Sequence, residues 1–155
     1  MNFRLIGRLF GGCLPALAII GISGCGGAYD AKVSGAIKLD GASLPRGTVT
    51  FAPTGKGPAA YAQIDGGAYT VYTGREVGLP AGEYQVTVVA NEPAAARETE
   101  GGGPPPLGKA ITPPWYGSKD TSGLKFTVNK GRNTIDLDLK SQPPAGWKPP
   151  SGRKT

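Results

Sequence analysis

The chain has 155 residues, a formal net charge of +6, two cysteines and no histidine. This length accommodates one domain. The lack of histidine removes the commonest general base and the commonest transition-metal ligand. The sequence also has no basic run with interleaved aromatics, the pattern that would indicate a nucleic-acid partner. Glycine (26) and proline (15) punctuate apolar, alternating segments, as many short strands joined by turns require.

Residues 1–24 have the composition of an export signal. Arg4 and Arg8 form a positive region, and the apolar stretch that follows is too short and too broken by glycine and proline to span a bilayer comfortably. The stretch ends in Ile22-Ser23-Gly24-Cys25, which resembles the bacterial lipobox. The resemblance implies cleavage between Gly24 and Cys25 and a diacylglycerol (palmitate-type chains) on the Cys25 thiol. An ordinary secretory signal with a chance cysteine is the alternative.

A lipidated Cys25 predicts a protein held in the cell envelope, because two or three acyl chains are enough for stable membrane anchoring. Residues 25–31 would then be a short tether. Gly26 follows the cysteine where some bacteria use aspartate for inner-membrane retention, which favours the outer membrane. Cys13 would be removed with the signal, so the domain would fold without a disulfide.

Period-two alternation of apolar and polar residues predicts seven strands in residues 32–140. Turn signals separate them, and Asp65-Gly66-Gly67 should join the third and fourth strands into a hairpin. No segment has a helical period. The expected strands are 33–39, 48–51, 59–64, 68–73, 83–90, 124–129 and 134–140.

Residues 91–122 form the longest irregular segment, rich in alanine, glycine and proline, and are expected to be a flexible loop. Its far end carries bulky side chains, Ile111, Trp115 and Tyr116, that would gain by packing on the strands. Residues 141–155 are proline-rich and basic, and are expected to be an exposed, disordered tail.

Seven alternating strands predict an all-β fold, a seven-stranded antiparallel β-sandwich, because each sheet must hide one apolar face. The order of motifs also resembles carboxypeptidase-regulatory-like domains. The matching segments are Gly35–Gly41, Leu44–Phe51, Asp65-Gly66-Gly67-Ala68-Tyr69 and Pro80–Val88, and Pro114–Gly117 with Thr121–Leu124 is similar to a late motif in short bacterial lipoproteins of this type. The resemblance implies a transthyretin-like (prealbumin-like) Greek-key sandwich that serves as an accessory module and not as the peptidase itself.

Candidate catalytic groups are few. Ser122 with Lys125 is the nearest nucleophile–base pair, but a turn serine beside an outward lysine explains both residues. Asp136 and Asp138 share one strand face and could bind Ca²⁺ with help from Asp65 or Asp120. A solvated outer face explains this pair better, so we expect neither an enzyme nor a metal or other cofactor.

Aromatic residues suggest where contacts could form. Tyr61, Tyr69, Tyr72 and Tyr84 could make a sugar-binding face, although tyrosines in β-sandwiches are more often core and corner residues. Trp115, Tyr116 and Trp147 lie in the loop and the tail, and are the aromatics expected to be exposed as a contact surface.

Three functions fit these observations. The first is a lipid-anchored envelope module, with a non-catalytic binding or structural role toward an envelope protein or polysaccharide. The second is a lipoprotein that captures a small ligand or polysaccharide, which needs a concave pocket. A hydrolase is the third, and it lacks recognisable machinery.

Overall fold

A computed structural model describes residues 28–94 and 108–148. These residues form strands, turns and one 3-10 turn, which confirms the all-β class. The export signal, Cys25, the centre of the predicted loop and the end of the tail lie outside the described residues. Within these described ranges, no helix is long and apolar enough to cross a membrane. The elements are β1 (Ala31–Leu39), β2 (Ala42–Ser43), β3 (Arg46–Pro53), β4 (Ala60–Asp65), β5 (Ala68–Thr70), β6 (Tyr72–Thr73), β7 (Glu76–Val77), β8 (Gly82–Val89), η1 (Pro114–Gly117), β9 (Leu124–Val128), β10 (Gly131–Thr134) and β11 (Leu137–Leu139).

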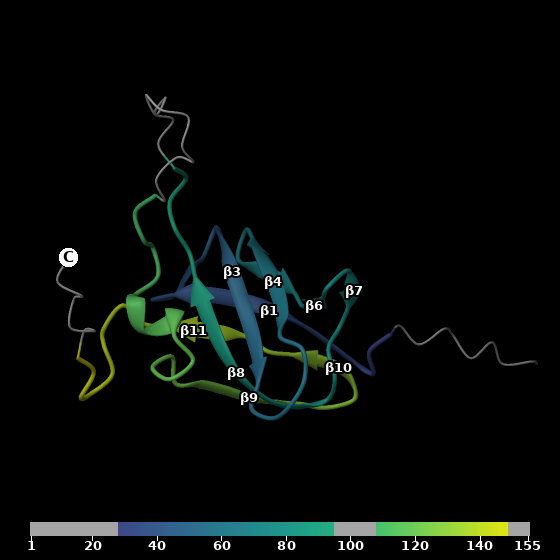
Figure 1. Cartoon of the computed structure of the whole chain (residues 1–155). Coiled ribbons are helices and arrows are strands. Elements are labelled where there is room, and N and C mark those ends of the chain that lie inside the picture. Colours follow the sequence, from purple (N-terminus) through teal and green to yellow (C-terminus); the bar gives the residue numbers. More distant parts are fainter. Residues whose placement is uncertain (1–27, 95–107, 149–155) are drawn as a thin grey trace, which may run out of the picture.

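Each of the seven predicted segments contains strand residues. The fourth is divided into β5 and β6, and the seventh, 134–140, is mainly β11. The strand β10 was not predicted, because it occupies Gly131–Thr134, where the sequence indicated a turn. The strands β2 and β7 are short additions that pair with β1 and β6 respectively. The main path through the curled sheet runs β10-β1-β5-β4-β3-β8-β9, as Figure 1 shows.

The sequence predicts strands that are all antiparallel, and this expectation is wrong for one part of the sheet. β10 and β11 both run parallel to β1, with Ala31 opposite Gly131 and Ile37 opposite Leu137. The other ladders are antiparallel. The reason is topological: β9 pairs with β8 at one end of the path, and the chain then crosses to the other end, where it arrives in the direction of β1.

Two-residue turns fix the registers of the hairpins. Gly66 and Gly67 have φ of 56° and 86°, and they join Asp65 to its partner Ala68. Positive φ at both central residues is the requirement of a type I′ hairpin turn, which glycine meets without strain. The predicted hairpin is therefore confirmed, and its register decides which side chains of β4 and β5 share a face.

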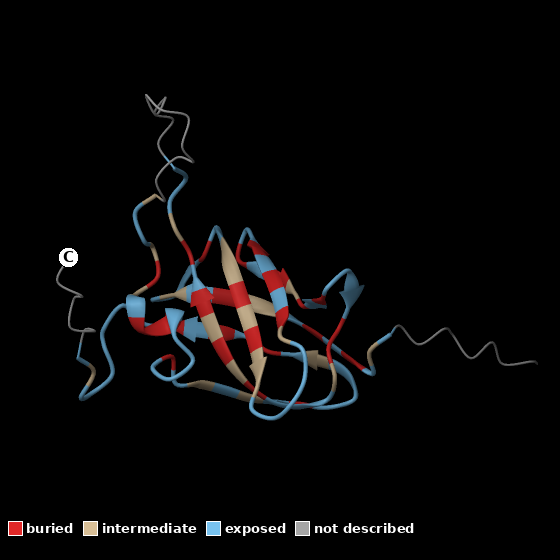
Figure 2. Ribbon diagram, in the orientation of Figure 1, coloured by how far each residue is buried: buried red, intermediate tan, exposed pale blue. Residues whose placement is uncertain are grey.

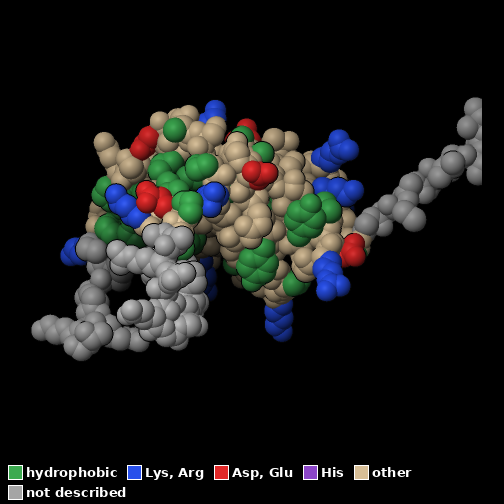
Figure 3. Space-filling view, turned by 90° about the horizontal axis from the view of Figure 1, so that it is seen from above, with side chains coloured by type: hydrophobic (Ala, Val, Ile, Leu, Met, Phe, Trp, Pro, Cys, Tyr) green, Lys and Arg blue, Asp and Glu red, His purple; other side chains and the backbone are tan. Residues whose placement is uncertain are grey.

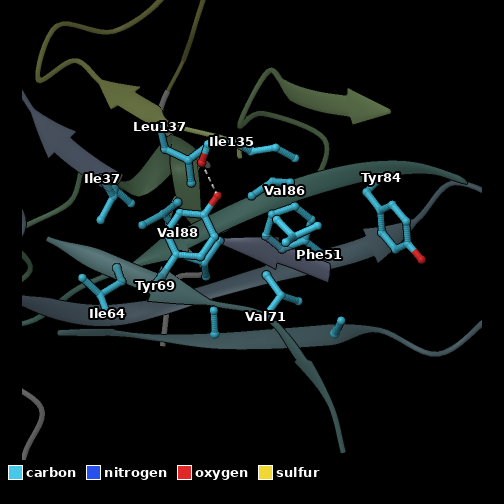
Figure 4. Packing of buried hydrophobic residues seen from close by; sticks show 14 of the residues in the cluster. Ile37, Phe51, Ile64, Tyr69, Val71, Tyr84, Val86, Val88, Ile135 and Leu137 are labelled. Carbon is cyan, nitrogen blue, oxygen red and sulfur yellow. Dashed lines mark hydrogen bonds between the residues drawn. The ribbon is translucent and has the colours of Figure 1, made fainter. Parts of the chain in front are cut away.

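The core lies inside the curl of the sheet. Burial alternates along the strands in the way the sequence predicts, most regularly on β4 and β8 (Figure 2). Phe51 lies at its centre, with ring centroids 6.3 Å from Tyr69 and 6.1 Å from Tyr84. Strands toward both ends of the path contribute to the same cluster, since it includes Ile37 of β1 and Leu137 of β11 as well as Val86 of β8 (Figure 4).

Between β10 and β11, where the ladder with β1 is interrupted, side chains make hydrogen bonds to the backbone. The Asp136 carboxylate accepts a hydrogen bond from the Ala36 amide at 2.8 Å, and Tyr69 Oη donates to the Ile135 carbonyl at 2.6 Å (Figure 4). A Cβ at Gly35 would overlap the Ile135 carbonyl, so only glycine fits there. Tyr69 thus ties the hairpin to the end of the sheet. Burial, and secondarily the Asp136 charge, raises the pKa of Tyr69 above its ordinary value.

The segment after β8 is ordered at both described ends. Asn91 forms a bridge with Ala110, and the Ile111 amide donates to the Ala90 carbonyl at 2.8 Å. Thr112 Oγ1 accepts from the Ala90 amide at 2.9 Å. These bonds close the base of the predicted loop and direct the chain into η1. The expected anchoring of the far end of this segment is confirmed.

Candidate functional site

The aromatic trio expected to form an exposed contact surface is largely covered. Trp115 and Tyr116 on η1 are only 7% and 8% exposed, so the expected exposure of these two is wrong. Tyr116 Oη accepts from the Lys140 amide at 2.9 Å, and the Trp115 carbonyl accepts from Thr121 Oγ1 at 2.7 Å. Trp147 is half-buried, with its ring centroid 4.9 Å from that of Trp115. The described part of the tail is therefore docked at Trp147, although its other residues are exposed.

The candidate catalytic serine is part of a turn. Ser122 is 6% exposed, its amide donates to the Ser118 carbonyl at 2.8 Å, and its hydroxyl accepts from the Leu124 amide at 3.3 Å. Lys125 is an exposed residue of β9 opposite Gln85. The hydroxyl is thus occupied in local hydrogen bonding, which is the ordinary structural use of serine at a turn.

The candidate metal-binding aspartates are distributed over separate parts of the fold. Asp136 binds a backbone amide at the junction of β10 and β11, and Asp138 is exposed on β11. Asp65 ends β4 in the hairpin, and Asp120 follows η1. Within the described residues, no three acidic, cysteine or histidine side chains come together where they could hold a metal ion.

The four tyrosines considered together in the sequence divide into two pairs. Tyr69 and Tyr84 are core residues, and Tyr84 Oη donates to the Pro80 carbonyl at 2.8 Å. Burial, and secondarily Asp30, raises the pKa of Tyr84. Tyr61 and Tyr72 are the opposite case, with 52% and 41% of each residue exposed.

Tyr61, Tyr72 and Val77 form one apolar row on the outside of the sheet, which we call the tyrosine row. Tyr61 on β4 is opposite Tyr72 on β6, and Tyr72 is opposite Val77 on β7. Directly paired residues of antiparallel strands place their side chains on the same face. Val77 is 38% exposed, so the row contains three of the four exposed large hydrophobic side chains in the described part of the chain.

A shallow groove of about 750 Å³ adjoins this row on β1, β4 and β5. Its aromatic side is Tyr61 and Tyr72, and we call it the tyrosine groove. The face drawn in Figure 3 is largely backbone and uncharged polar side chains, with hydrophobic side chains and some charged ones among them. The other lining side chains outside the core are those of Ser34, Gln63, Asp65 and Ala68, which are exposed, and of Thr70, which is half-buried; only Asp65 among them is charged.

The arrangement suits binding. Two aromatic rings offer apolar faces, while the hydroxyls of Ser34 and Thr70 and the amide of Gln63 offer donors and acceptors on the same surface. Pockets of this kind combine apolar contact with a few polar groups that fix orientation. The groove's lining includes no pair of groups suited to nucleophilic catalysis.

The sequence led us to consider the four tyrosines together as a sugar-binding face, with Tyr69 and Tyr84 fitting core positions well. The alternation carried part of the signal for the other two. Tyr61 lies on the strand face opposite to that of Ala60 and Ala62, and Tyr72 shares a face with Thr70. What the alternation lacked was the register that puts the two rings opposite each other across two strands.

Comparison of the chain with protein-family models, with curated proteins and with solved structures finds no match. The resemblance to carboxypeptidase-regulatory-like domains therefore stays a prediction from sequence motifs.

Proposed function

We propose that this protein is a lipid-anchored accessory module of the bacterial cell envelope that binds a polysaccharide through the tyrosine groove without catalysing a reaction. The observation that carries this proposal is the tyrosine row: Tyr61, Tyr72 and Val77 are exposed side by side, next to a neutral polar floor. The apolar face of a sugar ring can pack on the tyrosine rings, and its hydroxyl groups can form hydrogen bonds with the polar side chains of the floor.

A polymer fits this groove better than a small enclosed ligand. A small-molecule site typically covers most of its ligand, whereas this groove is open along the sheet face. A protein partner would also use the exposed row, but it would leave the polar floor without specific contacts. The polar side chains of Ser34, Gln63 and Thr70, which line the groove beside the two rings, favour a hydroxylated chain.

Several observations support a non-catalytic role. The chain has no histidine, and the Ser122 hydroxyl is engaged in a turn. The hydroxyls of Tyr69 and Tyr84 donate to backbone carbonyls and have raised pKa values, so they remain protonated structural donors at neutral pH.

The anchor is supported by the Ile22-Ser23-Gly24-Cys25 motif, which lies outside the described residues. Intact-protein mass spectrometry of membrane fractions tests it. We expect wild type to begin at Cys25 and to carry added acyl mass, and Cys25→Ala to be soluble or uncleaved. Soluble, unacylated wild type would refute anchoring and leave a secreted β-domain.

The finer fold assignment is part of the same proposal: a transthyretin-like, Greek-key sandwich. It is supported by the sequence motifs and by a seven-strand path whose two ends share one core. An experimental structure with two face-to-face sheets would establish it, and a single closed barrel would refute it.

Binding is tested with the full chain in a non-ionic detergent, by affinity electrophoresis through gels that contain soluble polysaccharides, neutral and acidic. We expect retardation in at least one gel, with affinity reduced about tenfold in Tyr61→Ala and in Tyr72→Ala, since an aromatic contact contributes about 1 kcal/mol beyond its area. The matched control is Val89→Ala, an exposed apolar residue of β8 outside the groove. Failure to bind any polysaccharide, or binding insensitive to both tyrosines, would contradict the proposal.

A further inference from the structure

A second depression continues the tyrosine groove toward the start of β1. It has a volume of about 290 Å³ and shares Ser34 and Thr70 with the tyrosine groove. These two residues are direct partners across β1 and β5, so the two depressions meet along one pair of side chains. Val77, the last member of the tyrosine row, also lines the second depression. A single extended ligand can therefore occupy both.

The second depression is lined by two basic residues, whereas the first has a single charged lining residue, Asp65. Lys32 on β1 and Arg132 on β10 are direct partners in the parallel ladder, and both are exposed. Both line this depression, together with Asn133 and Thr134. Like charges placed opposite each other across a sheet destabilise it unless something offsets their repulsion. Figure 3 shows Lys and Arg side chains gathered at one end of the molecule's upper face.

Acidic side chains of the described residues do not neutralise this pair. The one ion pair found within residues 28–94 and 108–148 joins Lys130 to Asp30 at 3.5 Å and involves neither Lys32 nor Arg132. Asp65, the only charge in the tyrosine groove, is in register with Ala36 of β1 through Ala68, and Lys32 lies four residues along β1 from Ala36, about 13 Å at the usual strand rise. Solvent and salt screen most of its effect at that distance.

Together these features select the charge of the ligand. We propose that the ligand of the continuous groove is an acidic polysaccharide, with sugar rings on Tyr61 and Tyr72 and a carboxylate between Lys32 and Arg132. This inference rests on the proposed function and adds the substrate class. Arginine and lysine on adjacent strands offer a carboxylate several charge-assisted donors, and binding relieves their mutual repulsion.

Two other anionic partners fit the geometry less well. An acidic peptide commonly docks by adding a strand to an open sheet edge, whereas this groove lies on a sheet face whose backbone groups are used in ladders. An anionic bilayer presents charged headgroups to the basic residues, but it offers no sugar rings for Tyr61 and Tyr72 and no specific partner for Gln63. A thin chain with hydroxyls and carboxylates uses every part of the groove.

The experiment compares polygalacturonate with the same polymer after methyl esterification, which removes the charge and keeps the sugar backbone. Binding of the full chain in non-ionic detergent is measured by isothermal titration calorimetry at two salt concentrations. The variants are Lys32→Gln, Arg132→Gln and Tyr61→Ala. Lys125→Gln is the matched charge control, because this lysine is exposed on β9 and lines neither depression.

We expect Lys32→Gln and Arg132→Gln each to lower affinity for polygalacturonate about fivefold at low salt, as an exposed ion pair permits, and to leave the esterified polymer unaffected. Tyr61→Ala should weaken both polymers, and Lys125→Gln neither. If Tyr61→Ala weakens binding of both polymers but Lys32→Gln and Arg132→Gln do not selectively weaken binding of polygalacturonate, this inference alone is overturned. Undiminished binding of both polymers in Tyr61→Ala overturns the proposed function as well.

Poly-L-glutamate and anionic phosphatidylglycerol vesicles test the other partners. We expect that the binding of neither probe is weakened by both Tyr61→Ala and Lys32→Gln. If poly-L-glutamate binds as tightly as polygalacturonate and is weakened by both substitutions, the site recognises an acidic peptide and the inference is wrong. If only the vesicles bind, with the same dependence, the basic end is a membrane contact and the inference is equally wrong.

Discussion

Replacing Tyr69 by phenylalanine tests the hydrogen bond that connects the hairpin to the end of the sheet. The hydroxyl donates to the Ile135 carbonyl at 2.6 Å, and both groups lie in the buried core. The substitution leaves that carbonyl without its partner, and an unsatisfied buried acceptor costs about 1–3 kcal/mol. We therefore expect Tyr69→Phe to lower the free energy of unfolding by about 2 kcal/mol.

Tyr84→Phe is the matched comparison. Its hydroxyl donates to the Pro80 carbonyl at 2.8 Å, but that bond is only part-buried, so water can replace the lost donor. We expect a cost of about 0.5–1 kcal/mol. Urea unfolding followed by circular dichroism measures both variants, with unchanged m-values as the sign that the denatured state is unaffected. A Tyr69→Phe cost equal to or below that of Tyr84→Phe would refute the reasoning.

Burial of the Tyr69 hydroxyl also makes stability sensitive to alkali. Burial raises the pKa of Tyr69 in the folded chain above the value of about 10 that it has when unfolded. Its contribution is therefore complete below pH 10 and falls as pH rises further, because only the unfolded chain releases the proton. The slope contributed is at most about 1.4 kcal/mol per pH unit. Between pH 10 and 11, we expect Tyr69→Phe to lose less stability than wild type, and equal slopes would contradict this.

Two further substitutions test packing at other points. Gly35→Ala forces a Cβ into the Ile135 carbonyl and should cost at least about 3 kcal/mol or prevent folding, whereas Gly55→Ala, with open space around it, should be neutral, as thermal unfolding will show. Trp147→Ala removes the ring that lies 4.9 Å from Trp115, and should cost about 1 kcal/mol and shift the remaining tryptophan fluorescence to the red. An unchanged emission spectrum would show that Trp147 does not cover Trp115.

The alternation of apolar and polar residues predicted most of the strands, because the curled sheet buries one face and exposes the other to solvent. Alternation places Ala60, Ala62 and Ile64 on one face of their strand, and all three are buried. Alternation carries no information about direction, so it could not reveal that β10 and β11 run parallel to β1. That pairing depends on where the chain crosses after Asn129, which is a property of the whole topology.

The candidate site was harder to predict because exposure of aromatics depends on tertiary contacts. Trp115 and Tyr116 lie in irregular chain, where loop residues are usually exposed, but η1 turns both onto β8 and the last strands. Tyr61 and Tyr72 lie in strands, where aromatics are usually buried, and the register leaves both on the outer face. The exposure expected for Trp115 and Tyr116 was wrong, whereas the sequence left open which tyrosines form an exposed face.

The exposure of Tyr61 alone does not imply function, since strands favour aromatic and β-branched residues even on wet faces. Tyr61→Thr separates the two explanations, because threonine keeps the strand propensity and the pairing with Thr50 but removes the ring. If the tyrosine serves binding, unfolding free energy should change by less than about 0.5 kcal/mol while polysaccharide affinity falls about tenfold. A stability loss above about 1 kcal/mol with unchanged affinity would mean that the ring serves the sheet and that the ligand lies elsewhere.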